Sequence, residues 1–280
     1  MRKIKNLFKS SFGKNVVMIA GGTAFAQVLS SLLSPIISRI YTPEDFGVLT
    51  VYSAILGMIS LLGALSYDSA IPIAENDEKA INVLGLCLLI LCISTIGLTL
   101  VLYLIGKPLL NMLNAEQLLN YRFLLVIGFF LTGLYTVLMS WAFRQRNFKT
   151  ITKTKFSQSI TSNGVKLGLG FLNSGANGLI LGRIFSESAG ITTLAAPFLR
   201  RESHLLQTIS KAGMRWAAKR YLRFPLFSAP GLLLVSVSSQ LPSIFINSIY
   251  GAQVIGLYGF AFSIVYLPMS LIGKAIQDVF

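Results

Sequence analysis

The stretch Ser38–Gly47, SRIYTPEDFG, decides the fold because it joins two long apolar runs. The run before it, Val16–Ile40, and the run after it, Phe46–Leu65, each contain about 20 residues or more, which is enough for a helix to cross a bilayer. We therefore interpret SRIYTPEDFG as a tight connection between two membrane-spanning helices.

The residues in the middle of this stretch have the chemistry of a helix start. Thr42 is a capping residue type, and Pro43 suits the first position of a helix. Glu44 and Asp45 would lie at the positive end of the helix dipole, so we interpret them as capping charges. The sequence thus predicts that the second helix begins at this point.

The same stretch has a second, weaker copy in the chain. A shift of 209 positions places Ile40 on Ile249, Tyr41 on Tyr250 and Gly47 on Gly256, and the second copy reads NSIYGAQVIG. Both copies lie between apolar segments. Many transporters are built from repeated helical units with the substrate held between them, so the pattern predicts an internal repeat.

Composition supports a membrane protein. The chain is 54% hydrophobic and only 12% charged, whereas soluble domains carry about 25% charged residues. The apolar segments are continuous, unlike the alternating segments of about 10 residues in a β-barrel. We expect an all-α polytopic bundle of about eight helices. They cover Val16–Ile40, Phe46–Leu65, Ala80–Ile105, Tyr121–Phe143, Ser157–Leu172, Ala176–Phe198, Phe224–Tyr250 and Gln253–Lys274.

The basic residues predict the orientation of this bundle. With the N-terminus inside, 19 of the 24 Lys and Arg residues fall in inside segments and only 3 in outside segments. Two basic connectors, Arg144–Phe156 and Arg200–Arg223, account for much of the excess. This asymmetry is typical of cytoplasmic loops and explains the net charge of +14 without a nucleic-acid partner. The basic residues 1–14 are expected to form a retained cytoplasmic anchor.

No enzyme signature is present in the sequence. Cys87 and Cys92 lie five residues apart in one apolar segment, which fits packing residues and neither a metal site nor a disulfide framework. His204 lies in a basic segment without other ligand types nearby. We therefore expect no catalytic residues, no metal and no cofactor.

Two cations are expected at membrane depth, Lys166 and Arg183. A charge there costs about 2.5–3.5 kcal/mol on insertion scales, so it usually faces a cavity or a partner. One interpretation is that both bind an anionic substrate. The alternatives are that Arg183 pairs with Glu187 four residues later, and that Lys166 extends to the interface.

Two further charges lie near helix ends. Arg39 is a candidate substrate-binding residue at the outer mouth, or an interfacial anchor. Asp68 is a candidate for binding a coupling ion, for protonation or for pairing with a basic residue, as is Glu187; alternatively, Asp68 is a simple helix-end charge.

SRIYTPEDFG resembles the start of the polysaccharide flippases, the O-antigen or capsular repeat-unit translocases of the superfamily that also contains multidrug exporters. The resemblance continues through Tyr67–Ile71, through WAFRQRNFKTITKTKF and through the last helix pair. It implies two six-helix bundles around a cavity that opens alternately to the two sides of a bacterial inner membrane. The implied substrate is an undecaprenyl-pyrophosphate-linked oligosaccharide. A polysaccharide polymerase and a chain-length regulator are the implied protein partners.

On this basis residues 1–223 are assigned to the first six-helix bundle and residues 224–280 to the start of a second, repeated bundle. Because eight helices are fewer than the twelve or fourteen of the family, we expect the second bundle to be truncated.

Other functions remain open. A cation-coupled exporter of drugs or metabolites would have the same fold and would need acidic residues deep in a helix. A membrane glycosyltransferase would need a large outer loop, which the chain does not offer. An inactive fragment that only packs in the membrane is the last alternative.

Overall fold

The computed structural model describes residues 11–112 and 115–277, which form helices and their connections without a strand. The long helices are α2 (Ser11–Ile40), α3 (Pro43–Ser60), α4 (Asp77–Leu104), α6 (Arg122–Arg144), α7 (Phe148–Phe171), α8 (Ala176–Arg201) and α10 (Ala229–Gln277). The short ones are η1 (Tyr67–Ala70), α5 (Gly106–Met112), η2 (Glu116–Tyr121), η3 (Ser203–Thr208), α9 (Lys211–Arg220) and η4 (Phe224–Ser228). The predicted all-α membrane fold is confirmed. Most of the predicted basic anchor lies outside the described residues.

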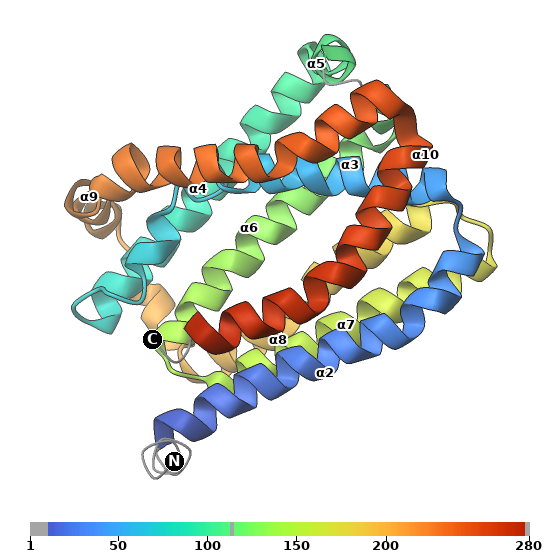
Figure 1. Cartoon of the computed structure of the whole chain (residues 1–280). Helices are drawn as coiled ribbons and strands as arrows, with labels where there is room; N and C mark the ends of the chain where they lie inside the picture. The colour runs from blue at the N-terminus through green and yellow to red at the C-terminus, as the bar shows by residue number, and fades with distance from the viewer. Residues whose placement is uncertain (1–10, 113–114, 278–280) are drawn as a thin grey trace.

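Four segments of the described chain are long and apolar enough to cross a membrane by themselves: Gly21–Ile40, Asp77–Leu104, Glu116–Arg144 and Phe224–Val265. The last of these is two helices in sequence, because Gly251 has φ of 79° and interrupts α10. Figure 1 shows α10 turning back on itself, so that its second half returns toward the side where α2 begins. The predicted boundary between the last two helices is therefore in the right place.

The connection between α2 and α3 has the predicted cap. The Asp45 amide donates to the Thr42 hydroxyl over 3.2 Å, and the Thr42 amide donates to the Asp45 carboxylate over 3.0 Å. Pro43 occupies the first turn of α3. These contacts satisfy amides that would otherwise lack partners, which explains why α2 and α3 separate so sharply at this point.

The two copies of the repeated stretch meet each other. A β-carbon on Gly47 of α3 would overlap the carbonyl oxygen of Ala252, and one on Gly256 of α10 would overlap the carbonyl oxygen of Pro43. The shift of 209 positions relates Gly47 to Gly256 and Pro43 to Ala252, so the two contacts are equivalent. The absence of side chains lets the two helices approach backbone to backbone.

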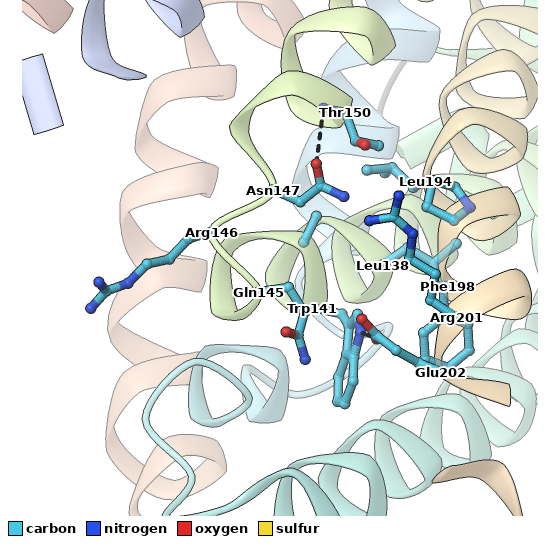
Figure 2. Close-up of a pocket in the computed structure, with 12 residues that line it drawn as sticks. Leu138, Trp141, Gln145, Arg146, Asn147, Thr150, Leu194, Phe198, Arg201 and Glu202 are labelled. Atoms are coloured by element: carbon cyan, nitrogen blue, oxygen red, sulfur yellow. Dashed lines mark hydrogen bonds between the residues drawn. The ribbon is translucent and has the colours of Figure 1, made fainter. Parts of the chain in front are cut away.

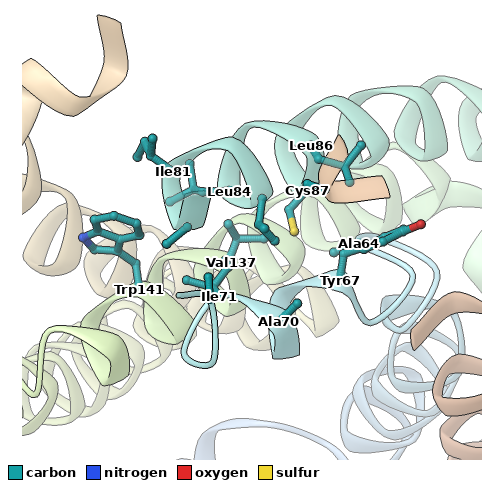
Figure 3. Close-up of a cluster of buried hydrophobic side chains, with 14 of the residues drawn as sticks. Ala64, Tyr67, Ala70, Ile71, Ile81, Leu84, Leu86, Cys87, Val137 and Trp141 are labelled. Atoms are coloured by element: carbon teal, nitrogen blue, oxygen red, sulfur yellow. The ribbon is translucent and has the colours of Figure 1, made fainter. Parts of the chain in front are cut away.

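The basic segments gather at one end of the bundle. Figure 1 shows the start of α2, α9 and the end of α10 on the same side of the molecule, away from α5. An apolar cluster supports this end, with η1 packed under α4 and α6 (Figure 3). Tyr67 in η1 donates a hydrogen bond of 3.0 Å to the carbonyl of Ala218 in α9, which ties the two connections together.

The predicted basic connectors are partly wrong. The first, Arg144–Phe156, becomes helical at Phe148, where Asn147 accepts a hydrogen bond from the Thr150 amide over 3.3 Å. The buried side chains of Ile151 and Thr154 hold this turn against its neighbours. The second connector contains α9, capped by Ser210. Short helices are only marginally stable by themselves, so burial and capping against neighbouring segments decide where these helices form.

Arg144 holds the chain between η1 and α4. Its guanidinium donates to the carbonyls of Ile71 and Ala74 over 3.1 and 2.7 Å and forms an ion pair of 2.9 Å with Asp77. Arg144→Ala is expected to destabilise the protein by about 2–4 kcal/mol, because the carbonyls of two buried residues lose a charged donor. Thermal unfolding in detergent measures this effect. Arg200→Ala, which removes an exposed cation, is the control and is expected to change little.

Candidate functional site

A cavity of about 240 Å³ lies between the first helix pair, α7, α8 and the second half of α10. Three serines of α2, Ser30, Ser31 and Ser34, line one side, and α10 contributes Gly259, Phe260, Ser263 and Ile264. The walls therefore come from both copies of the predicted repeat. Hydroxyl groups and apolar side chains face the same space, which suits a ligand with both polar and apolar parts.

Lys166 is the one charged side chain among the described residues that line this cavity. Its aliphatic stem packs over Gly182 of α8, where a β-carbon would overlap the Lys166 side chain. The Tyr41 hydroxyl donates a hydrogen bond of 2.6 Å to the Lys166 carbonyl and fixes the backbone of α7. The placement of Lys166 agrees with the prediction that this cation faces a cavity.

Asn163 lies one turn before Lys166 on α7 and lines the same cavity. Its amide donates to the Ser30 hydroxyl over 3.1 Å and to the Ser159 carbonyl over 2.8 Å. The Ser159 hydroxyl in turn donates to the Ala26 carbonyl over 3.0 Å. This network joins α2 to α7 and orients the polar wall beside the ammonium group.

Two aromatic rings close another side of the cavity. Phe46 of α3 and Phe260 of α10 meet edge to face, with ring centroids 5.1 Å apart. Gly259 packs directly against Thr50, so the second half of α10 lies close to α3 at this level. Aromatic faces beside hydroxyl and ammonium groups match the apolar faces and polar edges of a sugar.

Arg183 does not line this cavity. Its guanidinium contacts the Ser53 hydroxyl at 3.4 Å, and its Nε atom is buried without a hydrogen-bond partner. Arg183 is close enough to Lys166 and to Glu187 for electrostatic interaction, yet neither ion pair of the described residues joins it to Glu187. The two predicted cations are therefore brought near each other, but only Lys166 faces the cavity.

A third cation belongs to the bundle interior, and the sequence prediction placed it wrongly in a connector. Lys155 lies on α7, and its ammonium donates to the Tyr135 hydroxyl over 2.8 Å. The Tyr135 hydroxyl donates onward to Gln158 over 3.3 Å, and Glu187 interacts electrostatically with Lys155. Two cations therefore offset the charge of Glu187: Lys155 on α7 and Arg183 on α8.

The remaining predicted site residues lie elsewhere. Arg39 is exposed at the end of α2 and is not among the residues that line the cavity. Asp68 lies in η1, at the opposite end of the first helix pair, and lines a separate, smaller cavity. Direct substrate contact by Arg39, and a coupling role for Asp68 or Glu187, stay predictions.

Another cavity, of about 290 Å³, lies at the ends of α6, α7 and α8 (Figure 2). Two of its polar side chains have structural roles: Glu202 accepts a hydrogen bond from the Trp141 indole, and Asn147 caps α7. The Arg146 side chain extends away from the cavity in Figure 2. We therefore place the candidate site at Lys166.

Comparison with models of known protein families shows which family this chain belongs to. Residues 36–280 match the model of a family described as "Polysaccharide biosynthesis protein". The chain belongs to this polysaccharide biosynthesis family. The resemblance to polysaccharide flippases seen in the helix-end motifs is thereby confirmed. Among curated proteins no match is found.

This member of the polysaccharide biosynthesis family has a transporter fold. It is similar to a multidrug resistance MATE family transporter of the MOP superfamily in an inward-facing conformation, with a TM-score of 0.71 and 18% sequence identity. The match covers 90% of this chain and 60% of the other. The chain thus spans less than two thirds of that structure. At this identity the likeness establishes the fold alone.

Sequence reasoning about this family member missed Asn163 and the aromatic pair. Asn163 follows the small residues of a polar helix, and Phe46 and Phe260 lie in apolar runs, so no local signal marks them. Ser30, Ser31 and Ser34 of α2 are small residues, which by themselves predict close helix packing. The one available signal was their spacing, because Ser30 and Ser34 lie on one helical face.

Proposed function

We propose that this protein takes part in moving an undecaprenyl-pyrophosphate-linked oligosaccharide across the bacterial inner membrane by alternating access, for O-antigen or capsule assembly. The family and the transporter fold support a membrane exporter of polysaccharide precursors. The lipid tails would remain in the bilayer, while the sugars and the pyrophosphate pass through the polar cavity. No covalent chemistry is required of the protein.

The observation that carries this proposal is the position of Lys166. The ammonium side chain of Lys166, which lines a cavity with several hydroxyl groups, offers a charge-assisted contact to a phosphate and hydrogen bonds to a sugar. A phosphate must lose water to pass the hydrocarbon region, and a fixed cation offsets part of that cost. The rings of Phe46 and Phe260 add an apolar surface for a pyranose face.

The proposal also includes the orientation of the protein in the membrane and the division of the chain into two bundles. The N-terminus and the basic connectors would face the cytoplasm, where basic residues are typically retained. Residues 1–223 would form the first bundle and residues 224–280 the start of the second. The equivalent contacts of Gly47 and Gly256 support a repeat relationship between these parts. A polysaccharide polymerase and a chain-length regulator are the proposed protein partners.

A cation-coupled exporter of drugs or metabolites is the second candidate. Glu187 favours it, because one oxygen of this acidic side chain is buried in the bundle without a hydrogen bond. Such a group can exchange a proton or an ion during transport. The two candidates differ in substrate: the first requires an anionic lipid-linked sugar and the second an organic cation.

Proteoliposomes that contain the protein separate the two functions. We expect a fluorescent polyprenyl-pyrophosphate oligosaccharide to become accessible to a membrane-impermeant quencher on the opposite side, at a rate above that of protein-free vesicles. Ethidium efflux, measured in the same vesicles under an ion gradient, is expected to stay at the protein-free rate. Ethidium transport without oligosaccharide translocation would favour the exporter and contradict the proposal.

A further inference from the structure

A second site candidate is the cavity of about 100 Å³ beside η1, which is distinct from the cavity at Lys166. Its polar lining consists of oxygen-bearing side chains only: Ser60, Ser66, Asp68, Ser69 and Thr136. The other described lining residues are apolar or glycine, and none is Lys, Arg or His. A cavity lined by carboxylate and hydroxyl oxygens without a cationic side chain has the donor set that hard metal cations prefer.

The oxygens of this cavity are available to a ligand. Ser66 is only 5% exposed, and its hydroxyl has no hydrogen-bond partner. The Ser60 hydroxyl donates to the Gly57 carbonyl over 3.0 Å, and the Thr136 hydroxyl donates to the Thr132 carbonyl over 2.8 Å. A hydroxyl that donates to its own helix still has lone pairs for a cation. Buried polar groups are normally satisfied, so the unpartnered Ser66 hydroxyl indicates a missing partner.

Asp68 lacks a balancing charge in this position. Neither ion pair of the described residues involves it. Burial raises the pKa of the Asp68 carboxyl, because the charged form loses water without gaining a cationic partner. A bound cation would supply the missing interaction and favour the ionised carboxylate.

The backbone around Asp68 is held in a fixed and strained form. Leu65 and Ser66 have φ of 48° and 62°, which L-residues adopt only at a cost. The buried side chains of Tyr67 and Ala70 anchor η1 in the apolar cluster of Figure 3, on either side of Asp68. Strain that is kept by surrounding packing is typical of preformed sites.

We propose that this cavity binds a monovalent metal cation, with Na⁺ as the best match. The Asp68 carboxylate is the charged ligand, and the hydroxyls of Ser66, Ser60 and Thr136 are the neutral ligands. A single carboxylate balances one positive charge, whereas Ca²⁺ sites generally use more than one. The cavity is bounded by the end of α3, by α6 and by Leu232 of α10, so a bound ion would connect the two parts of the predicted repeat. The proposal does not depend on the identity of the transported substrate.

Binding of ²²Na⁺ to the purified protein in detergent tests this site. The measurement is made at pH 8, well above the ordinary carboxyl pKa of about 4, with choline chloride holding the ionic strength constant. We expect saturable binding of one ion per chain. Asp68→Asn is expected to weaken the affinity at least tenfold, because it removes the one charged ligand. Glu78→Gln, which neutralises an exposed acid at the start of α4, is the matched control and should bind as the wild type does.

A second variant keeps the test informative even if Asp68→Asn fails to fold. Ser66→Gly removes the hydroxyl and relieves the positive φ, so it is expected to fold at least as well as the wild type while binding ²²Na⁺ several-fold more weakly. The proposal is overturned if the wild type shows no saturable binding. It is equally overturned if both variants bind with unchanged affinity. Excess unlabelled Ca²⁺ is expected to displace the ion less effectively than Na⁺, and the reverse order would contradict the assignment.

Discussion

Lys166→Met is expected to lower the rate of lipid-linked oligosaccharide translocation about 10- to 100-fold while leaving the protein folded. Methionine retains most of the stem that packs on Gly182, so the change removes chiefly the ammonium group. A charge-assisted hydrogen bond contributes about 1.5–3 kcal/mol, and each 1.4 kcal/mol is about a factor of ten. Quencher access to the fluorescent lipid-linked substrate in proteoliposomes measures the rate.

Two other variants on α7 serve as controls for Lys166→Met. Lys153→Met removes an exposed cation of α7 and is expected to keep the wild-type rate. Lys166→Arg keeps the charge but enlarges the head group, so it is expected to retain part of the activity. Equal rates for the wild type and Lys166→Met, at equal protein content per vesicle, would remove Lys166 from the substrate path.

Gly256→Ala is expected to lower the midpoint of thermal unfolding by about 3–10 °C, because the added methyl group would overlap the Pro43 carbonyl oxygen. Overpacking of a close contact costs about 1–3 kcal/mol, and here the obstacle is backbone, which moves less easily than a side chain. Gly47→Ala should behave alike, since its methyl group would overlap the Ala252 carbonyl oxygen. Tryptophan fluorescence of the protein in detergent follows the transition.

Gly231→Ala on the same helix is the control for these glycine variants. No atom lies within 4 Å of a β-carbon at Gly231, so alanine is expected to leave stability unchanged or to raise it slightly. A midpoint for Gly256→Ala equal to that of Gly231→Ala would show that α3 and α10 are not in backbone contact. Similar losses for Gly47→Ala and Gly256→Ala would support the equivalence of the two contacts.

The functional role of the α3–α10 contact follows from its position. It lies at the end of the bundle away from the start of α2, and the cavity with Lys166 lies beside the same two helices. If the chain works by alternating access, separation of Gly47 from Gly256 would open that end. The contact is thus a place where stability and transport are expected to respond together.

Part of the fold could be predicted from local sequence. The Thr42 cap and the break at Gly251 each depend on a few neighbouring residues, and both are found where the repeated stretch places them. The long apolar runs similarly predicted α4 and α6, because hydropathy over about 20 residues is a local property. The two basic connectors were predicted less well, since their helices depend on burial against neighbouring segments.

The composition and placement of residues by themselves determined that this is a helical membrane protein with a helix–break–helix unit present twice, and that Lys166 is an uncommon charge within the bundle. Tertiary structure alone decided which side chains share a space. It placed Lys166 with Ser30 and Asn163, separated Arg183 from that cavity, and turned Lys155 inward. The physical reason is that periodicity gives each helix its faces, whereas the neighbour of each face depends on packing between segments more than 100 residues apart.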